Sequence, residues 1–483
     1  MPPMSALLLL LATAAPVAES APFVTTCSVA DHGAVPDNAT ANTLAFRAAA
    51  RACAGRGQRG SRAVILVPRG VWWTGAFNLS SHTELRLALG ATLAAVTSVS
   101  RDEYPAVAPF PSYGSCRDGG CAVPQPGNKK PPPAWCSART QALVSAFGAT
   151  DVVISGAGSM TEADAAASVI DGNGCWWWEK FMRKGGSILK VCRPQLVNFV
   201  SCTDVEVTGV TLKDPGFWNL HIWNTTGAHV HDLRIHADQH PTCGEPAGET
   251  VRAVNSDGID VDSSQDVLVE RVYIEADDDA IAIKSGKDKP GRDFGVPTRN
   301  VTVRDSRLIS NDFAVGSECS GGCEDIVLRD IVMSSADSDA TTGCIDVLRV
   351  KSSAGRGGFI RNILVKNVHA LVVNNSLGGQ KHPDVFRFDL EGSGTPVTNL
   401  TVEDLRVEFA AGIAGQFYGS SASMPIRGLV LRNVTVANSS GGWVCRDVED
   451  AVFEDVYPPL DAKGGCRAKS ADATPPLPLH VNV

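Results

Sequence analysis

A short unit of alternating apolar and polar residues recurs through the second half of the chain. Each copy reads apolar-x-apolar-x, then one polar or glycine position, then apolar-x-apolar. Looser copies begin at Ala228, Val301, Ile363 and Ala451, and successive copies begin 22 to 39 residues apart. A period of two residues predicts strands, and the central position predicts a turn between two of them. The clear copies are Val205–Leu212, Val267–Ile274, Ile326–Met333, Leu400–Val407 and Leu429–Val436.

A parallel β-helix explains this repeat better than other architectures that are rich in strands. No helical pattern separates the units, which disfavours doubly wound folds and (β/α) barrels. The tight turns of a hairpin sandwich, at intervals of about 8–12 residues, are scarce. A propeller, the remaining alternative, has more regular blades. Units of uneven length fit the rungs of an all-β solenoid, whose long loops build the functional site.

The residues before the repeat predict a cap for one end of the solenoid. Asn42–Ala54 is rich in Ala and Arg with helical spacing, and Thr40 or Asn42 could be its N-cap. A helix there would cover the open end of the first rung. We expect the first strands at Val64–Leu66 and Leu85–Leu87.

Three other segments fall outside this regular pattern. Ala6–Ala15 is apolar and is followed by small residues, which predicts a signal peptide over residues 1–21; a buried N-terminal helix is the alternative. Tyr104–Cys136 is rich in Pro and Gly and contains three Cys, which predicts a long, cross-linked loop. The solenoid is expected over residues 22–470 and an extended tail over 471–483.

Composition and charge narrow the class of protein. Of 483 residues, 44% are hydrophobic and 20% are charged, which predicts a folded chain. The 52 acidic and 43 basic residues give a net charge of −9, which disfavours a nucleic-acid partner. Later apolar stretches stay below about 18 residues, so we expect a soluble mature protein with no membrane partner.

The cysteines suggest an oxidising compartment. All 14 follow the predicted leader, and an even number in an exported chain indicates disulfides. No Cys-x-x-Cys pair occurs, which disfavours a zinc ribbon. Cys319–Cys323 and Cys116–Cys121 are possible short loops. Eight Asn-x-Ser/Thr sequences after the leader permit glycosylation.

The densest acidic segment lies within the repeat. Asp257 and Asp279 are 22 residues apart, which is the shortest repeat interval. One rung of separation places equivalent positions about 4.8 Å apart, so Asp257, Asp278 and Asp279 are expected to converge. Carboxylates this close give acid and base forms at one pH, as glycosidases require. Calcium ligation and plain solvated turns are the alternatives.

Two cations and several aromatic residues lie on either side of this segment. Arg349 and Lys351 are two residues apart, so a strand would point both to the same face, where they could hold a substrate carboxylate or simply face water. Five tryptophans and a histidine precede the acids. Each could stack on or bind a sugar, but burial in the rung core is the more common use. They are Trp176–Trp178, Trp218, Trp223 and His221.

Taken together, these motifs resemble the polygalacturonase family, glycoside hydrolase family 28. Asn255-Ser-Asp257, then Asp278-Asp279, then Arg349-Val-Lys351 match its ordered motifs. The resemblance covers roughly residues 24 to 460. It implies a right-handed parallel β-helix, a secreted enzyme of the cell wall or extracellular space, a monomer, no cofactor and no catalytic metal.

The family's histidine motif, Gly-His-Gly, is missing. Counting back from Gly316-Ser317 puts Asn311 or Ser310 in the place of the histidine. The stretch Gly316–Gly322 resembles the branch that contains plant-type and exo-acting members. The departure makes the mode of attack and the preferred pectic chain open questions.

The resemblance implies a role for each matched residue. Asp278 would be the general acid, and Asp257 and Asp279 would hold and deprotonate the attacking water. Three further residues would bind substrate or position their neighbours: Asn255, Arg349 and Lys351. The expected reaction is the hydrolysis, with inversion, of α-1,4-galacturonosidic bonds in pectic polysaccharide or oligogalacturonide. The alternatives are a pectate-lyase-like eliminase and a non-catalytic pectin-binding solenoid.

Overall fold

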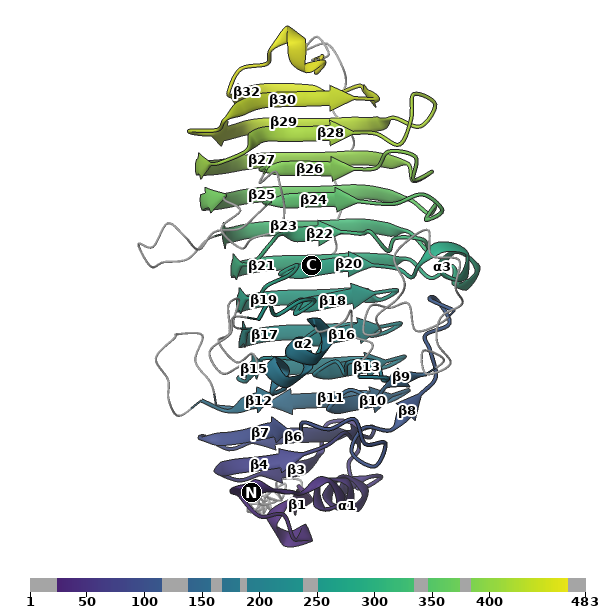
Figure 1. Ribbon diagram of the computed structural model, residues 1–483, viewed down its shortest axis with the longest axis vertical. Coiled ribbons are helices and arrows are strands. Elements are labelled where there is room, and N and C mark those ends of the chain that lie inside the picture. Colours follow the sequence, from purple (N-terminus) through teal and green to yellow (C-terminus); the bar gives the residue numbers. More distant parts are fainter. Residues whose placement is uncertain are drawn as a thin grey trace, which may run out of the picture.

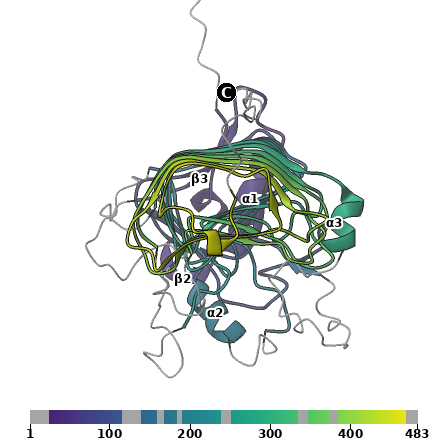
Figure 2. The same ribbon diagram turned by 90° about the horizontal axis from the view of Figure 1, so that it is seen from above.

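The computed structural model describes residues 24–114, 138–157, 167–182, 189–237, 251–333, 346–373 and 384–467. Within these ranges the chain coils into a tall stack of rungs, with the N-terminal residues at one end and the C-terminal residues at the other (Figure 1). Seen along the stack, successive rungs superimpose on one flattened outline (Figure 2). The predicted signal peptide, the C-terminal tail and the Cys116–Cys121 loop lie outside the described residues.

The walls of this stack are parallel sheets, which confirms the all-β, right-handed parallel β-helix expected from the repeat. The described residues form one 11-stranded and one 19-stranded sheet. The 11-stranded sheet consists of β5 (Phe77–Leu79), β10 (Val144–Phe147), β13 (Val197–Val200), β16 (Leu220–Trp223), β18 (Ile259–Asp262), β20 (Ile281–Lys284), β22 (Phe313–Val315), β24 (Leu348–Lys351), β26 (Phe386–Asp389), β28 (Ile413–Tyr418) and β30 (Gly441–Arg446).

The 19-stranded sheet is bent and forms the remaining wall of the coil. Its strands are β1 (Thr26–Ser28), β2 (Asp37–Ala41), β3 (Ala63–Val67), β4 (Gly70–Thr74), β6 (Thr83–Leu87), β7 (Ala91–Ala95), β11 (Thr150–Ser155), β12 (Val169–Asp171), β14 (Thr203–Thr208), β15 (Thr211–Lys213), β17 (Thr226–His236), β19 (Gln265–Glu275), β21 (Thr298–Ile309), β23 (Cys323–Met333), β25 (Ile360–Val373), β27 (Val397–Ala410), β29 (Ile426–Val436), β31 (Val448–Glu449) and β32 (Val452–Tyr457).

The sequence repeat sets the register of this second sheet. Each repeat start stands opposite the next one, as in the pairs Val205 with Ala228 and Ala228 with Val267. The same register continues through the later rungs, up to Leu400 opposite Leu429. Apolar positions of the repeat therefore stack in columns, and burial of these columns forms one continuous core along the solenoid.

The central position of the repeat is the bend of each rung. All nine residues there have a positive φ, in the left-handed region that L-residues other than Gly, Asn and Asp seldom adopt. Eight of the nine are Gly, Asn or Asp, so the residue type matches the backbone. They are Gly209, Asp232, Arg271, Asp305, Asp330, Asn367, Asp404, Asn433 and Asp455.

A helix closes the N-terminal end, as predicted. α1 (Thr43–Cys53) packs Phe46, Ala49 and Ala50 against the first rungs. Asn42, one of the two candidates, is the N-cap residue, but its side chain makes no capping bond to the helix. It bridges the preceding loop instead, where its Oδ1 accepts from the Val35 amide at 2.8 Å and its Nδ2 donates to the Val35 carbonyl at 3.0 Å.

The remaining helices lie on the outside of the coil (Figure 1). α2 (Gly174–Met182) follows β12 and α3 (Asp288–Phe294) follows β20, and short η1 (Ala30–His32) and η4 (Ala462–Gly464) lie near the two ends. The antiparallel pair β8 (Ala106–Val107) and β9 (Arg139–Thr140) flanks the predicted long loop. We call residues 104–114 the strap, because they run from this pair across the 11-stranded sheet.

Disulfides reinforce both ends of the solenoid and one loop beside its middle. They join Cys27 to Cys53, Cys319 to Cys323 and Cys445 to Cys466. The short loop proposed for Cys319–Cys323 is therefore confirmed. In the part of the chain that the structure describes, no helix combines the length and apolar character needed to cross a membrane.

Asp305 tests the left-handed bend, because its side chain is half exposed and its φ is 50°. We expect Asp305→Val to lower the free energy of unfolding by about 1–2 kcal/mol, since a β-branched residue is strained at positive φ. Asp305→Gly should lie closer to wild type, because glycine adopts this conformation freely. Urea unfolding of the three proteins measures the difference; equal losses in both variants would contradict the explanation.

Candidate active site

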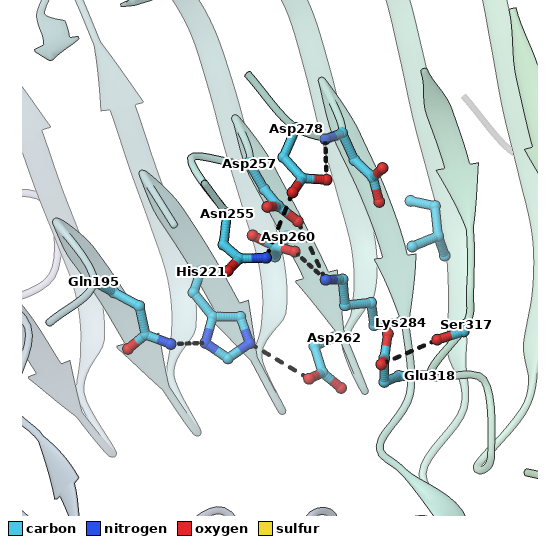
Figure 3. Close-up of polar contacts among 12 residues, drawn as sticks. Gln195, His221, Asn255, Asp257, Asp260, Asp262, Asp278, Lys284, Ser317 and Glu318 are labelled. Carbon is cyan, nitrogen blue, oxygen red and sulfur yellow. Dashed lines mark hydrogen bonds and ion pairs between the residues drawn. The ribbon is translucent and has the colours of Figure 1, made fainter. Parts of the chain in front are cut away.

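Three aspartates meet where two adjacent rungs enter the 11-stranded sheet. Asp257 precedes β18, and Asp278 and Asp279 precede β20, which pairs with β18 in register. One carboxylate oxygen from each lies within 4.8 Å of the other two, and Asp278 is the most exposed of the three. The predicted convergence is therefore confirmed, and Figure 3 shows Asp257 and Asp278 side by side.

A buried arginine holds the predicted positioning residue Asn255. The Arg193 Nη2 donates to Asn255 Oδ1 at 2.8 Å, and Arg193 Nη1 donates to the Val254 carbonyl at 2.7 Å. The Asn255 Nδ2 then donates to Asp278 Oδ2 at 3.4 Å, as Figure 3 shows. Asn255 therefore reaches the acid cluster as expected, and Arg193 is its support.

Lys284 balances the charge on the other side of the cluster. Its ammonium group is buried and lies 3.3 Å from Asp257 Oδ2 and 2.8 Å from Asp260 Oδ1 (Figure 3). The same nitrogen lies 4.0 Å from the centre of the Trp218 ring, a cation–π contact. Sequence reasoning gave Lys284 no role, although a lysine at an outward position of a buried strand is itself a signal of a buried acid nearby.

The two predicted cations, Arg349 and Lys351, lie on one face of β24. This strand is two rungs beyond β20, and both side chains extend back towards the acid cluster. Lys351 Nζ donates to both oxygens of Asp279, at 2.9 and 2.7 Å. Arg349 lies between two acids, 3.6 Å from Asp312 Oδ2 and 3.7 Å from Asp389 Oδ2. The structure thus brings both cations to the site, paired with protein carboxylates.

A fourth aspartate occupies the stretch where the histidine motif is missing. Both candidates for the histidine's place bond the backbone instead of the carboxylates: Asn311 Nδ2 donates to the Asp277 carbonyl, and Ser310 Oγ bonds the Ala276 backbone. Asp312 instead faces Asp279 and is fully buried. An aspartate directly before a strand, one residue closer to it than Asp257 and Asp279 are to theirs, was the signal that could have identified it.

The environment drives the carboxyl pKa values apart. The pKa of Asp279 lies well below its usual range, because the ammonium of Lys351 outweighs the effect of burial. Burial raises the pKa of Asp278, and the neighbouring charge of Asp279 raises it further. Burial likewise raises the pKa of Asp257 and of Asp312. Neighbouring carboxyls therefore have pKa values shifted in opposite directions, which is the arrangement that acid–base catalysis needs.

The aromatic residues are mostly structural. Trp177 and Trp178 are fully buried in the core. Trp223 is buried under the strap, stacked on Phe110 with ring centres 4.8 Å apart. His221 lies under the same aromatic cluster, held by Gln195 Nε2 at 3.1 Å and Asp262 Oδ2 at 3.4 Å (Figure 3). Burial in the rung core is therefore correct for Trp177 and Trp178, whereas Trp223 and His221 are buried outside the core, between the sheet and the strap.

The three aspartates could in principle offer oxygen ligands to a cation, since their oxygens lie within 4.8 Å of one another. The charges around them argue against it. Lys284 and Lys351 already place ammonium groups on Asp257 and Asp279. Calcium takes six to eight oxygen ligands, and a divalent ion here would face two fixed positive charges.

The arrangement defines an acid–base enzyme built on the outer face of a solenoid, with the carboxyl pair of a glycosidase. The family model described as "Glycosyl hydrolases family 28" matches residues 136–454. The chain therefore belongs to this family and is a glycoside hydrolase.

Individual relatives agree with this assignment. The chain is 30% identical over 437 residues to a probable polygalacturonase of Vitis vinifera, covering 87% of this chain and 77% of that protein. It is 24% identical to polygalacturonase-2 of Solanum lycopersicum, covering 60% and 58%.

Solved structures share the fold. An exopolygalacturonase of Thermotoga maritima superimposes with a TM-score of 0.65 at 21% identity, covering 89% of this chain and 91% of that one. A family 28 exopolygalacturonase of Yersinia enterocolitica gives 0.65 at 19% identity, covering 91% and 76%.

Lys284 allows a test of the buried charge balance. We expect Lys284→Met to lower the free energy of unfolding at pH 8 by about 3–5 kcal/mol, because it leaves Asp257 and Asp260 buried without their counter-charge. The loss should shrink towards pH 5, since the pKa of Asp260 is raised to about 7 and a protonated carboxyl needs no cation.

Lys213 provides the matched control, because it also bridges two aspartates, Asp171 at 3.1 Å and Asp214 at 3.2 Å, but is 40% exposed. Lys213→Met should cost at most about 1 kcal/mol. Chemical denaturation at both pH values checks the pair. Equal losses in the two variants, or a Lys284→Met loss that does not vary with pH, would show that Lys284 is not a buried counter-ion.

Proposed function

We propose that the protein is a polygalacturonase-type hydrolase that cleaves α-1,4-galacturonosidic bonds in pectic polysaccharide. The observation that carries the proposal is a pair of neighbouring carboxyls, within 4.8 Å of each other, whose pKa values are shifted in opposite directions. Asp279 is kept ionised by Lys351, while Asp278 beside it holds its proton to higher pH. The names of the relatives support the substrate class.

Each aspartate receives a role from its environment. Asp278, the most exposed and with a raised pKa, protonates the glycosidic oxygen. Asp279, the ionised one, accepts the proton of the attacking water. Asp257 lies within reach of both and positions that water, with Lys284 favouring its ionised form. Asn255 orients Asp278 through its amide.

Inversion of the anomeric centre is part of the proposal and rests on family membership. Inverting sites commonly separate the acid and the base by about 6.5–9.5 Å to admit water. The nearest oxygens of these carboxyls lie within 4.8 Å, so the separation alone does not favour inversion. The configuration of the first-formed product, read by proton NMR, decides the stereochemistry directly.

Arg349 and Lys351 give the site its affinity for an acidic sugar. The protein is acidic overall, so a uronate must be attracted by a local positive charge. The two side chains are 16% and 19% exposed and project from β24 beside the acid cluster. We propose that they bind the galacturonate carboxylate next to the scissile bond, with Arg349 forming a charge-assisted hydrogen bond.

The exposure of the sheet suggests attack at a chain end. On the N-terminal side of the acids, the outward residues His221 and Asp262 are completely buried, and the strap covers them. Tyr113 Oη donates to Asp262 Oδ2 at 2.6 Å, and the Trp223 indole donates to Ser112 Oγ at 2.9 Å. In the described part of the chain the strap covers this side, so we infer that a polymer continues from the acids towards β24, β26 and β28, which favours exo action.

Export remains part of the proposal. The disulfides at Cys27–Cys53 and Cys445–Cys466 are typical of proteins that fold in an oxidising compartment. Together with the predicted signal peptide over residues 1–21, they support secretion to the extracellular space or cell wall. We further propose a monomer whose solenoid spans residues 22–470.

Two alternatives predict different products. A calcium-dependent eliminase would leave an unsaturated uronide that absorbs ultraviolet light, but the ammonium groups on Asp257 and Asp279 oppose a divalent ion. A non-catalytic solenoid would bind pectin fragments and release no reducing ends. No feature of the described residues favours either alternative over hydrolysis.

Asp278→Asn tests the assignment of the general acid. We expect hydrolysis of polygalacturonate to fall by at least about 100-fold, because the amide cannot protonate the leaving oxygen. Thermal unfolding should change little, since Asn255 Nδ2 can still donate to the amide oxygen. Asp305→Asn, which removes a carboxyl at a distant left-handed bend that Asn also tolerates, is the control and should retain full activity.

Near-normal release of reducing ends by Asp278→Asn would remove Asp278 from the mechanism. Ultraviolet-absorbing products from the wild type would establish elimination in place of hydrolysis. A wild type that binds oligogalacturonides without producing new reducing ends would establish the binding-only alternative.

The closed N-terminal side makes a prediction about product size. Incubation with long oligogalacturonides should release one short product from the first minutes, with the remaining chain shortening step by step. Chromatography of samples over time resolves this pattern. A broad mixture of intermediate sizes at early times would show internal attack and contradict exo action.

A further inference from the structure

One carboxylate outside the acid cluster ties together side chains from three successive rungs. Asp389 Oδ2 accepts from Arg387 Nε at 2.8 Å and lies 3.7 Å from Arg349 Nη2. Its other oxygen accepts from Gln416 Nε2 at 3.2 Å. Asp389 therefore fixes outward side chains of β24, β26 and β28 in one row.

Arg387 occupies on its rung the position that Arg349 occupies on the rung before. The two residues stand opposite each other in the parallel pair β24–β26, as do Lys351 and Asp389. Residues opposite each other in a parallel pair point to the same face, so both guanidinium groups lie on the face that carries the acids. Their exposed fractions are also similar, at 16% and 19%.

The spacing of the two arginines suits successive units of a linear uronide. Neighbouring rungs are about 4.8 Å apart, a distance comparable to the advance of one 1,4-linked sugar. A chain that leaves the acids along the sheet would bring its next carboxylate over β26. A guanidinium has five N–H donors, so it can hold Asp389 and a second carboxylate together.

We propose that Arg387 binds the carboxylate of the second galacturonate, one unit beyond the sugar held by Arg349 and Lys351. Asp389 orients this guanidinium and Arg349 through the shared oxygen, so the two cations form one recognition row. The site takes an unesterified uronate, because a methyl ester has no charge to pair with. This inference rests on the proposed function and extends the same site by one sugar.

A similar pair on the other sheet shows the difference between a binding position and an ordinary surface pair. Arg406 Nε donates to Glu408 Oε1 at 2.7 Å, two residues along β27, as Arg387 does to Asp389. Arg406, however, is 63% exposed and lies on the sheet opposite the acids. Arg406→Gln is therefore a matched control for Arg387→Gln.

The test compares oligogalacturonides of two and three units. A dimer fills only the positions on either side of the scissile bond, whereas a trimer also reaches β26. We expect Arg387→Gln to raise the KM for the trimer by about tenfold or more with kcat within about twofold, and to leave dimer kinetics unchanged. Arg406→Gln should match wild type on both substrates.

Three outcomes would overturn the inference. They are an unchanged trimer KM in Arg387→Gln, an equal loss on dimer and trimer, and an equal loss in Arg406→Gln. Calorimetry with trigalacturonate and its methyl ester adds a binding readout that needs no turnover. If wild type binds the trimer but cleaves neither substrate, the proposed hydrolysis fails, and the Arg387 inference is still decided by whether Arg387→Gln weakens binding of the acid but not of the ester.

Discussion

The in-register stacking of rungs is the constraint on which the rest of the molecule depends. Each rung is too small to bury its own apolar side chains and is stable only between its neighbours. The same register that aligns Ile259 with Ile281 in the core also places Asp257 beside Asp278 and Asp279 on the outside. The active-site geometry is thus a direct product of core packing.

The buried charges show what this geometry demands. Moving a carboxylate out of water costs free energy, so each buried carboxyl must either pair with a cation or stay protonated. Lys351 supplies the cation for Asp279, whereas burial raises the pKa of Asp278 and of Asp312, so both keep a proton to higher pH. This difference makes Asp278 the proposed acid and Asp279 the proposed base.

Much of the fold was predictable because its signals are local. Alternation and a recurring polar position predicted the strands, and all nine of these positions proved to be left-handed bends. Convergence of the three aspartates followed from counting one rung. Lys284 and Asp312 were not predicted in their roles, because each acts through a contact with another rung that no local pattern records. The Asn42 side chain likewise accepts a hydrogen bond from the Val35 amide in the preceding loop and none from its helix, a choice set by the tertiary structure.

The strap has a consequence for the order in which the protein forms. Tyr113 must wait for Asp262, which lies 149 residues further along the chain. At about 5–20 residues per second of synthesis, roughly 7 to 30 seconds separate the appearance of the two partners. During this interval the strap can dock on Trp223 but not on Asp262, so its last contact forms only after the rung that contains β18 has been laid down. A protein that grows from one end would thus close this side of its active site only when the middle of the solenoid has formed.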